Sequence, residues 1–330
     1  MIKTRVLRVL AVLHGWTRGG AGCYLLAALL LLPVWAEPTL TLPGKVQDTL
    51  FVLDISESMN VTDVDSPRPH TPRLELAKAV ARESMAALNC GSRVSLALFA
   101  GEHAVVLFEP LEICRHFPAL EQVVSRLSTR MRWIGDSRIE AGLTYAINEA
   151  FARKMNLVFI SDGDEMPHRS MPRVTSLESL RGKVRGAVFV VGGDAPLPVP
   201  RLDGNDQVTG YWTPEEAVKE GFHPNLLSVV DMLAVCEKAP EGVLDEVGEH
   251  MSAARPAYME ILASAAGLEF RRLQKPGEAA ALVSGATLTR EAPAERDARW
   301  IFGLLACLLS LVGWFWPQIV SRQYREFLPR

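Results

Sequence analysis

Apolar runs alternate with amphipathic segments along the middle of the chain. The clearest run, Thr49 to Asp54, has four apolar residues in succession and ends in an aspartate. Strands covered by helices on both faces are continuously apolar, so this run predicts a buried strand. Further strands are predicted at 93–100, 156–160, 186–191 and 268–273, with a short hairpin partner at 104–108.

Between these strands, apolar residues recur at helical spacing. The segment 73–89 shows this pattern and stops before Gly91, a typical helix terminator. Other helices are predicted at 111–127, 139–150, 176–181, 258–266 and 277–283. The alternation predicts an α/β, Rossmann-like fold: a mostly parallel central sheet with one short antiparallel edge strand and helices on both faces. The stretch 194–250 breaks the rhythm with several prolines and is expected to be an accessory insertion.

Both ends of the chain differ from a globular core. Basic residues before position 19 precede an uncharged run, 21–36, which ends in Val34 and Ala36 at positions that suit cleavage. Residues 1–36 are therefore expected to be a signal peptide or an N-terminal membrane anchor, and the cleavage-compatible residues favour the signal peptide. Residues 37–48 are expected to be a linker.

At the other end, Trp300 to Trp316 is an uncharged run of seventeen residues. It predicts a transmembrane helix at the lower limit of length, after a linker at 286–299; a buried core helix is the alternative. The tail, 317–330, carries three arginines and is expected to be cytoplasmic. The segment between the two ends is then periplasmic, on a protein of the bacterial inner membrane.

Charge and composition narrow the function. The 330 residues are 48% hydrophobic, so a large core is available. Between the apolar ends lie 28 basic and 37 acidic residues, an excess of nine negative charges. This balance argues against nucleic acid as a partner and fits a cation or a basic protein surface.

Three of the five cysteines, Cys90, Cys114 and Cys236, lie between the apolar ends. In an oxidising compartment they can form one disulfide and leave one thiol. Cys90 closes the first predicted helix and Cys114 opens a later one, so a Cys90–Cys114 bond is predicted. There is no C-x-x-C motif, which makes a redox enzyme or a zinc site improbable.

The polar end of the first strand carries the candidate chemistry. Asp54, Ser56 and Ser58 form D-x-S-x-S, which offers one carboxylate and two hydroxyls from one turn. Such hard oxygen donors suit Mg²⁺, with Mn²⁺ or Ca²⁺ as alternatives. The competing interpretation is an ordinary helix cap or turn, in which the same residue types are common.

Two further loops are expected at the same edge of the sheet. They are Gly135-Asp136-Ser137 and Ser161-Asp162-Gly163, and the second continues into Asp164 and Glu165. Asp136, Asp164 and Glu165 are possible modulators of charge, although a solvated acidic loop competes for the last two. Asp63 and Asp65, in the loop after the first strand, are expected to be solvated.

Together the three loops resemble the metal-ion-dependent adhesion site, or MIDAS, of von Willebrand factor A (vWA) domains, over roughly 49–285. The family commonly has threonine where Ser137 stands here. The resemblance implies metal binding by Asp54, Ser56, Ser58, Ser137 and Asp162, the last directly or through a water. It also implies an open coordination position for an Asp or Glu carboxylate of a protein partner.

The layout resembles bacterial Bat-type membrane vWA proteins and, more closely, the Mxa-group accessory proteins of methanol dehydrogenase. The segments Asn89-Cys-Gly-Ser and Phe108-Glu-Pro, and Cys114, carry the second resemblance. It implies a metal-dependent binding and assembly module that aids maturation of, or calcium insertion into, a periplasmic quinoprotein, together with other vWA accessory proteins. The alternative is a general envelope or stress assembly factor that works with a chaperone-like ATPase.

An enzyme is not expected. A phosphoryl-accepting aspartate normally has a second carboxylate two residues on, and Ser56 stands there instead. G-x-S-x-G and H-E-x-x-H motifs are both absent. A metal-dependent hydrolase and a scaffold with a decayed metal site are therefore the weaker alternatives.

Overall fold

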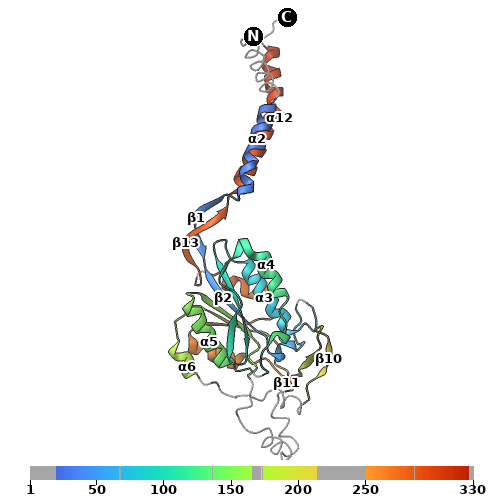
Figure 1. Cartoon of the computed structure of the whole chain (residues 1–330), viewed down its shortest axis with the longest axis vertical. Coiled ribbons are helices and arrows are strands. Elements are labelled where there is room, and N and C mark those ends of the chain that lie inside the picture. Colours follow the sequence, from blue (N-terminus) through green and yellow to red (C-terminus); the bar gives the residue numbers. More distant parts are fainter. Residues whose placement is uncertain are drawn as a thin grey trace, which may run out of the picture. The chain divides into compact units, whose positions relative to one another are not determined.

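The computed structural model describes residues 20–326, except for 67, 136, 166–171, 173, 214–249 and 286, and except for the side chains of 316–326. The chain divides into two compact units (Figure 1). We call residues 44–292 the sheet unit. The terminal unit consists of 1–43 and 293–330, the two ends of the chain.

The centre of the sheet unit is β2 (Asp48–Asp54), which is buried along its whole length. The sheet has the strand order β12-β7-β6-β2-β3-β4, and β5 also pairs with β3. β12 (Glu269–Arg272), β7 (Gly186–Val190), β6 (Asn156–Ser161), β2 and β3 (Arg93–Ala100) run parallel, whereas β4 (His103–Val106) and β5 (Leu111–Glu112) are antiparallel to β3. The predicted mostly parallel sheet is confirmed, with two short antiparallel strands where one was expected.

Helices cover both faces of this sheet (Figure 1). One layer contains α3 (Arg73–Ala86), α4 (Ile113–Ser125) and α11 (Gly277–Val283); the other contains α5 (Ile139–Ala152), α6 (Thr175–Ser179) and α10 (Pro256–Ala266). Side chains alternate across a strand, so Phe51 and Leu53 enter the first core while Leu50 and Val52 enter the second. Because both faces are packed, β2 is apolar at the four successive positions from Leu50 to Leu53, which explains the continuous run in the sequence.

Short strands lie in the described parts of the expected insertion, 194–250, and directly after it. β8 (Leu197–Pro198) pairs with β11 (Met251–Ser252), and β9 (Pro200–Leu202) pairs with β10 (Val208–Tyr211). In the turn of the β9–β10 hairpin, Asp206 accepts hydrogen bonds from Ser128 Oγ and Arg130 Nε, each at 2.7 Å. The hairpin is thereby attached to the segment around the short helix η3 (Thr129–Met131).

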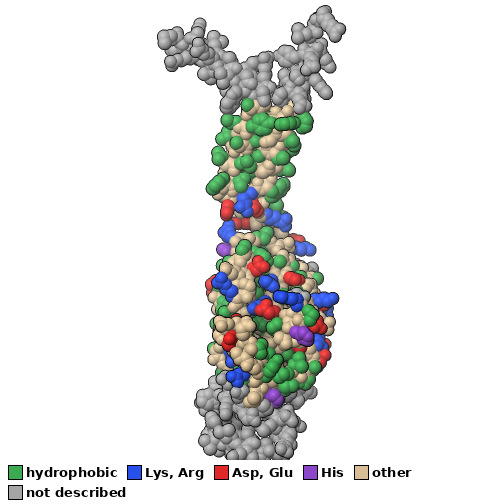
Figure 2. All heavy atoms as spheres, turned by 90° about the vertical axis from the view of Figure 1, so that its right-hand side faces the viewer, with side chains coloured by type: hydrophobic (Ala, Val, Ile, Leu, Met, Phe, Trp, Pro, Cys, Tyr) green, Lys and Arg blue, Asp and Glu red, His purple; other side chains and the backbone are tan. Residues whose placement is uncertain are grey.

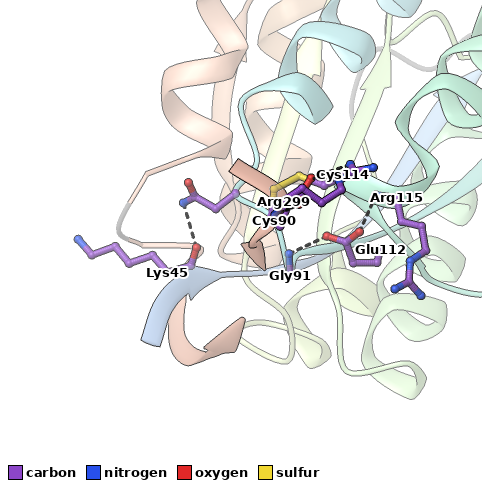
Figure 3. Close-up of a disulfide and its surroundings, with 9 residues drawn as sticks. Lys45, Cys90, Gly91, Glu112, Cys114, Arg115 and Arg299 are labelled. Carbon is purple, nitrogen blue, oxygen red and sulfur yellow. Dashed lines mark hydrogen bonds and ion pairs between the residues drawn. A yellow bond between two sulfur atoms is a disulfide. The ribbon is translucent and has the colours of Figure 1, made fainter. Parts of the chain in front are cut away.

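Cys90 and Cys114 form a disulfide between the loop after α3 and the start of α4 (Figure 3). Beside it, Glu112 accepts hydrogen bonds from the backbone amides of Gly91 and Arg115, both at 2.7 Å. Cys90 precedes the first residue of β3, so the bond lies at the end of the sheet opposite to Asp54. Cys236 lies outside the described residues.

In the terminal unit, the two ends of the chain pair with each other. β1 (Thr39–Val46) pairs with β13 (Arg290–Asp297), and α2 (Ala21–Leu31), followed by the short helix η1 (Leu32–Ala36), lies along α12 (Arg299–Glu326) (Figure 1). The stretches 37–48 and 286–299, expected to be linkers, thus contain most of a two-stranded ribbon. Local patterns do not reveal this ribbon, because its strands are some 250 residues apart and largely exposed.

Two glycines allow α2 and α12 to approach closely. A Cβ added to Gly20 would lie 2.2 Å from the carbonyl oxygen of Gly313, and one added to Gly313 would lie 3.0 Å from Cys23 Cβ. Small residues at such crossings are typical of tightly packed apolar helices. Hydrophobic side chains dominate the surface of this helix pair (Figure 2), including Leu25, Leu29, Leu304, Leu308 and Phe315.

The sequence predicted a transmembrane helix over 300–316. Within the described part of the chain, no helix is long and apolar enough to cross a membrane. The run lies instead within α12, which begins at Arg299. The alternative of a buried core helix is wrong, because most of the large apolar side chains described in α12 are exposed.

Candidate functional site

The first and third predicted loops meet at the carboxyl ends of two neighbouring strands. β2 ends at Asp54 and the parallel strand β6 ends at Ser161. Ser161 Oγ donates a hydrogen bond to Asp54 Oδ2 at 2.6 Å. Parallel strands place their carboxyl ends at one edge of the sheet, where ligand sites of open α/β sheets form.

The second loop approaches the same edge from the other side of β2. Arg132 pairs with Glu57 at 2.5 Å, which joins this loop to the first one. Ser137 forms a parallel bridge with Gly101, the residue that follows β3, and the amide of Arg138 donates to the Gly101 carbonyl at 2.8 Å. The fold therefore brings all three predicted loops to one edge of the sheet.

In the first loop, Asp54, Ser56 and Ser58 are all buried. The amide of Ser56 donates to Asp54 Oδ1 at 2.8 Å, and the hydroxyl oxygens of Ser56 and Ser58 lie 3.0 Å apart. Ser56 precedes the short helix η2 (Glu57–Asn60), but its side chain makes no capping hydrogen bond. Ser56 therefore does not cap η2, but the hydrogen bond from the Ser56 amide to Asp54 is that of an ordinary turn, and in this turn the two hydroxyls are held next to each other beside a carboxylate.

In the third loop, Asp162 is fully buried and paired with the fully buried guanidinium of Arg73. Arg73 Nη1 lies 2.8 Å from Asp162 Oδ2, and the amide of Asp164 donates to Asp162 Oδ1 at 3.0 Å. Arg73 also donates to Asp63 through Nε at 3.0 Å and to Ser252 Oγ at 2.7 Å. Both oxygens of Asp162 thus already accept hydrogen bonds within the protein.

Burial and the neighbouring charge of Asp162 raise the pKa of two carboxyl groups at this edge, Asp54 and Asp164. Burial and the charge of Asp162 raise the pKa of Asp54 to about 7, against hydrogen bonds from Ser161 and Ser56. Burial and the same charge raise the pKa of Asp164 to about 7. Arg73 supplies one positive charge to this group and shares it with Asp63. A further cation would therefore stabilise the ionised carboxylates.

The hydroxyl of Ser137 provides a test of whether a cation fits. Ser137 is 1% exposed, and its Oγ has no hydrogen-bond partner among the residues that the structure describes. A buried polar atom without a partner costs about 1–3 kcal/mol, so such atoms are rare unless something else satisfies them. The donors are carboxylate and hydroxyl oxygens, which suit Mg²⁺, Mn²⁺ or Ca²⁺ rather than a softer metal.

The carboxylates alone are not sufficient to bind a metal ion at this edge. In the described part of the chain, no three His, Cys, Asp or Glu side chains are grouped so that they could hold a metal ion. A cation at this edge needs the serine hydroxyls as ligands as well as Asp54. That requirement agrees with D-x-S-x-S and Ser137 as the donor set.

Several sequence expectations about the surrounding acids are corrected. Asp164 and Glu165 are buried, not part of a solvated loop, and Glu165 accepts a hydrogen bond from the Tyr258 hydroxyl. Asp63, also expected to be solvated, has only 7% of its side chain exposed, because it pairs with Arg73. Asp136, a possible modulator, lies outside the described residues.

Sequence analysis missed Arg73 and Ser252, and it gave no role to Ser161, which it named in the third loop. The pairing of Arg73 with Asp162 spans 89 positions, so no local pattern reveals it. One signal was present. Arg73 opens a helix whose next residues, Leu74, Leu76 and Ala77, face the core, and a charged residue there needs a buried partner.

The fold and the three loops define the class: an α/β domain with an oxygen-lined edge beyond its parallel strands. The von Willebrand factor type A domain family matches residues 49–165, a segment that contains all three loops. Over these residues the chain is similar to vWA domains. No curated protein matches the sequence significantly.

Solved structures also resemble this one. An aerotolerance-related membrane protein from Bacteroides fragilis is 18% identical, with 72% of this chain and 96% of that chain covered and a TM-score of 0.46. BatB from Bacteroides thetaiotaomicron is 16% identical, with 72% and 95% covered and a TM-score of 0.47. A manganese-loaded TRAP protein from Plasmodium vivax is 12% identical, with 78% and 82% covered and a TM-score of 0.35.

Proposed function

We propose that this protein is a non-enzymatic, metal-dependent binding and assembly module. Asp54, Ser56, Ser58 and Ser137 would hold a divalent cation, Mg²⁺ in the first place, and a carboxylate of a protein partner would complete the coordination. The charge of Asp162 is already paired with the buried guanidinium of Arg73, so Asp162 acts by orienting a bound water. When bound, the cation supplies positive charge to which an acidic side chain can attach.

The observation that carries this proposal is the buried, unpartnered hydroxyl of Ser137 at the same edge as Asp54. Its environment is short of positive charge, as the raised pKa values of Asp54 and Asp164 indicate. A cation would satisfy the hydroxyl and neutralise the carboxylate together. No rearrangement of the backbone is needed for the two serines of the first loop, which already lie side by side.

Thermal unfolding of the full-length chain with Mg²⁺, Mn²⁺ or Ca²⁺ tests the proposal. A ligand that binds only the folded state raises the melting temperature. We expect Mg²⁺ to stabilise the wild type and Asp65→Asn, which loses an exposed carboxylate in the loop after β2, but not Asp54→Ala. Each variant is compared with its own metal-free form. If Asp54→Ala responds to Mg²⁺ like the wild type, the assigned site is wrong.

The geometry of Asp54 supports binding over catalysis. Both oxygens of Asp54 accept hydrogen bonds, from the Ser56 amide and the Ser161 hydroxyl, and the side chain is fully buried. Ser56 stands where a phosphoryl-transfer enzyme needs a proton donor. Metal-dependent hydrolysis of a generic phosphatase or peptidase substrate, lost in Asp54→Ala, would instead support the hydrolase alternative.

We further propose that the sheet unit works in the periplasm, attached to the inner membrane. The Cys90–Cys114 disulfide supports an oxidising compartment. The exposed apolar surface of α2 and α12 supports attachment to a membrane. Because α2 is packed along α12, we propose that the N-terminal segment is a retained anchor and not a cleaved signal peptide.

For the pathway, we propose maturation of a periplasmic quinoprotein such as methanol dehydrogenase, including its calcium insertion. The support is the motif resemblance around Cys90 and Phe108. In the structure, Ser95 Oγ, on the strand β3 that follows Cys90, donates a hydrogen bond to the Phe108 carbonyl at 2.6 Å. The alternative is a Bat-type envelope assembly factor. Deletion of the gene distinguishes them: loss of calcium from the dehydrogenase supports the first, and a fully loaded dehydrogenase contradicts it.

A further inference from the structure

A groove lies on the outer side of the N-terminal half of α3. It has a volume of about 370 Å³ and is bounded by the loop 68–72 and by Glu75, Ala79 and Arg82, which follow one another at helical spacing along α3. The loop side contributes Arg68 and His70. This is a cavity in the sheet unit, separate from the side chains assigned to the cation.

The groove is positively charged. Arg68, His70 and Arg82 line it, and its only carboxylate, Glu75, is paired with Lys78 at 2.6 Å. Among the residues that the structure describes, neither Arg68 nor Arg82 has an acceptor for its guanidinium. Two unpaired guanidinium groups around one cavity are suited to carboxylate or phosphate oxygens, which they can bind in a bidentate manner.

The loop wall of the groove is held in place before any ligand arrives. Val64 and Thr71 form a backbone bridge, with the Thr71 amide donating to the Val64 carbonyl at 2.8 Å. Thr71 Oγ1 also donates to the carbonyl of Arg68 at 2.6 Å. A fixed wall lowers the conformational entropy that binding must overcome.

The groove is next to the candidate cation site along the chain and in the fold. The loop 68–72 leads directly into Arg73, whose guanidinium binds Asp162 and Asp63 at the cation edge. The N-terminal end of α3 therefore connects the Arg73 network, at the edge of the proposed cation site, with the Arg68–Arg82 groove. The rest of the segment between the apolar ends carries an excess of negative charge.

We propose that this groove binds a second acidic side chain of the partner whose first carboxylate completes the cation site. The identity of the partner rests on the proposed function, whereas the existence of the groove does not depend on it. The partner segment would be an acidic peptide with carboxylates on both sides of the α3 N-terminus. Charge complementarity of this kind sets orientation and the rate of association.

Fluorescence anisotropy of the full-length chain with labelled hexaglutamate tests the groove, with hexaglutamine and inorganic phosphate as comparison ligands. The test variant is Arg68→Gln/Arg82→Gln. The matched control is Arg126→Gln/Arg271→Gln, which removes two exposed arginines elsewhere on the sheet unit. Without Mg²⁺, we expect the test variant to weaken hexaglutamate binding about tenfold or more and the control about twofold or less.

Three outcomes would overturn the proposal. The first is an equal loss of hexaglutamate affinity in the test and control variants. The second is binding of hexaglutamine as tight as that of hexaglutamate. The third is phosphate binding that depends on Arg68 and Arg82 when hexaglutamate does not bind. The last would define a site for small anions only. The proposed function is tested separately by Asp54→Ala. Asp54→Ala can keep a Mg²⁺-dependent increase in affinity for hexaglutamate while binding still depends on Arg68 and Arg82. That result would contradict the proposed cation site and leave the proposed groove supported.

Discussion

Arg73 Nη1 lies 2.8 Å from Asp162 Oδ2, and neither side chain is accessible to solvent. The same guanidinium binds Asp63 and Ser252, so the first residue of α3 joins the loop after β2, the loop after β6 and the end of the insertion. This network places a fixed positive charge beside the candidate cation site. It also explains why Asp162 has no oxygen without a hydrogen bond.

Replacing Arg73 should lower the stability of the folded protein. Arg73→Gln leaves Asp63 and Asp162 buried without their partner, and breaking a buried ion pair in this way costs about 3–5 kcal/mol. Urea unfolding at pH 7 without metal measures the loss. Arg82→Gln, on the same helix but without an ion pair to a described residue, should change stability by about 0.5 kcal/mol or less. Equal effects of the two variants would show that the network is not stabilising.

The stabilising effect of Asp48 should be lost as the pH falls. Burial opposes its ionisation, but Arg93 and Arg290 outweigh burial and hold the pKa of Asp48 below 3.8. Asp48 therefore stabilises the fold fully above its ordinary pKa, and this contribution is lost as the pH falls through the lower folded-state value. Asp48→Asn should reduce stability at pH 7 by about 1 kcal/mol, since both arginines are half exposed, and by less at pH 2.

Urea titrations of the wild type and Asp48→Asn at several pH values between 2 and 7 measure this difference. Asp65→Asn serves as the control, because that carboxylate is exposed. A stability difference between wild type and Asp48→Asn that stays constant down to pH 2 would rule out the ion-pair explanation.

Packing of α2 along α12 predicts a specific cross-link. A Cβ on Gly313 would lie 3.0 Å from Cys23 Cβ, so Gly313→Cys needs only a small shift to reach disulfide geometry. In a Cys307→Ser background, mild oxidation should link Cys23 to the new cysteine. Gly303→Cys is the control, because nothing lies within 4 Å of a Cβ at that position. Mass spectrometry of the mature protein that finds no residue 23 would refute both the pairing and the retained anchor.

The parts of the fold that could be predicted are those whose signal is local. β2, β6 and β7 are continuous apolar runs, and α3 and α5 show helical spacing, so the sheet and the edge at which the loops emerge followed from pattern alone. Asp54, Ser56 and Ser58 were visible because they share one turn. The Arg73 network and the β1–β13 ribbon join residues far apart in the chain, and no local periodicity encodes such pairings.

Calorimetry of Mg²⁺ binding to the wild type, Ser137→Ala and Ser137→Thr is the most direct test of the central claim. The account predicts that wild type and Ser137→Thr bind one Mg²⁺, because both keep the hydroxyl. Ser137→Ala should lose most of the affinity while remaining at least as stable as the wild type without metal, since its buried unpartnered oxygen is gone. Wild-type affinity in Ser137→Ala, or no Mg²⁺ binding by the wild type, would contradict the account.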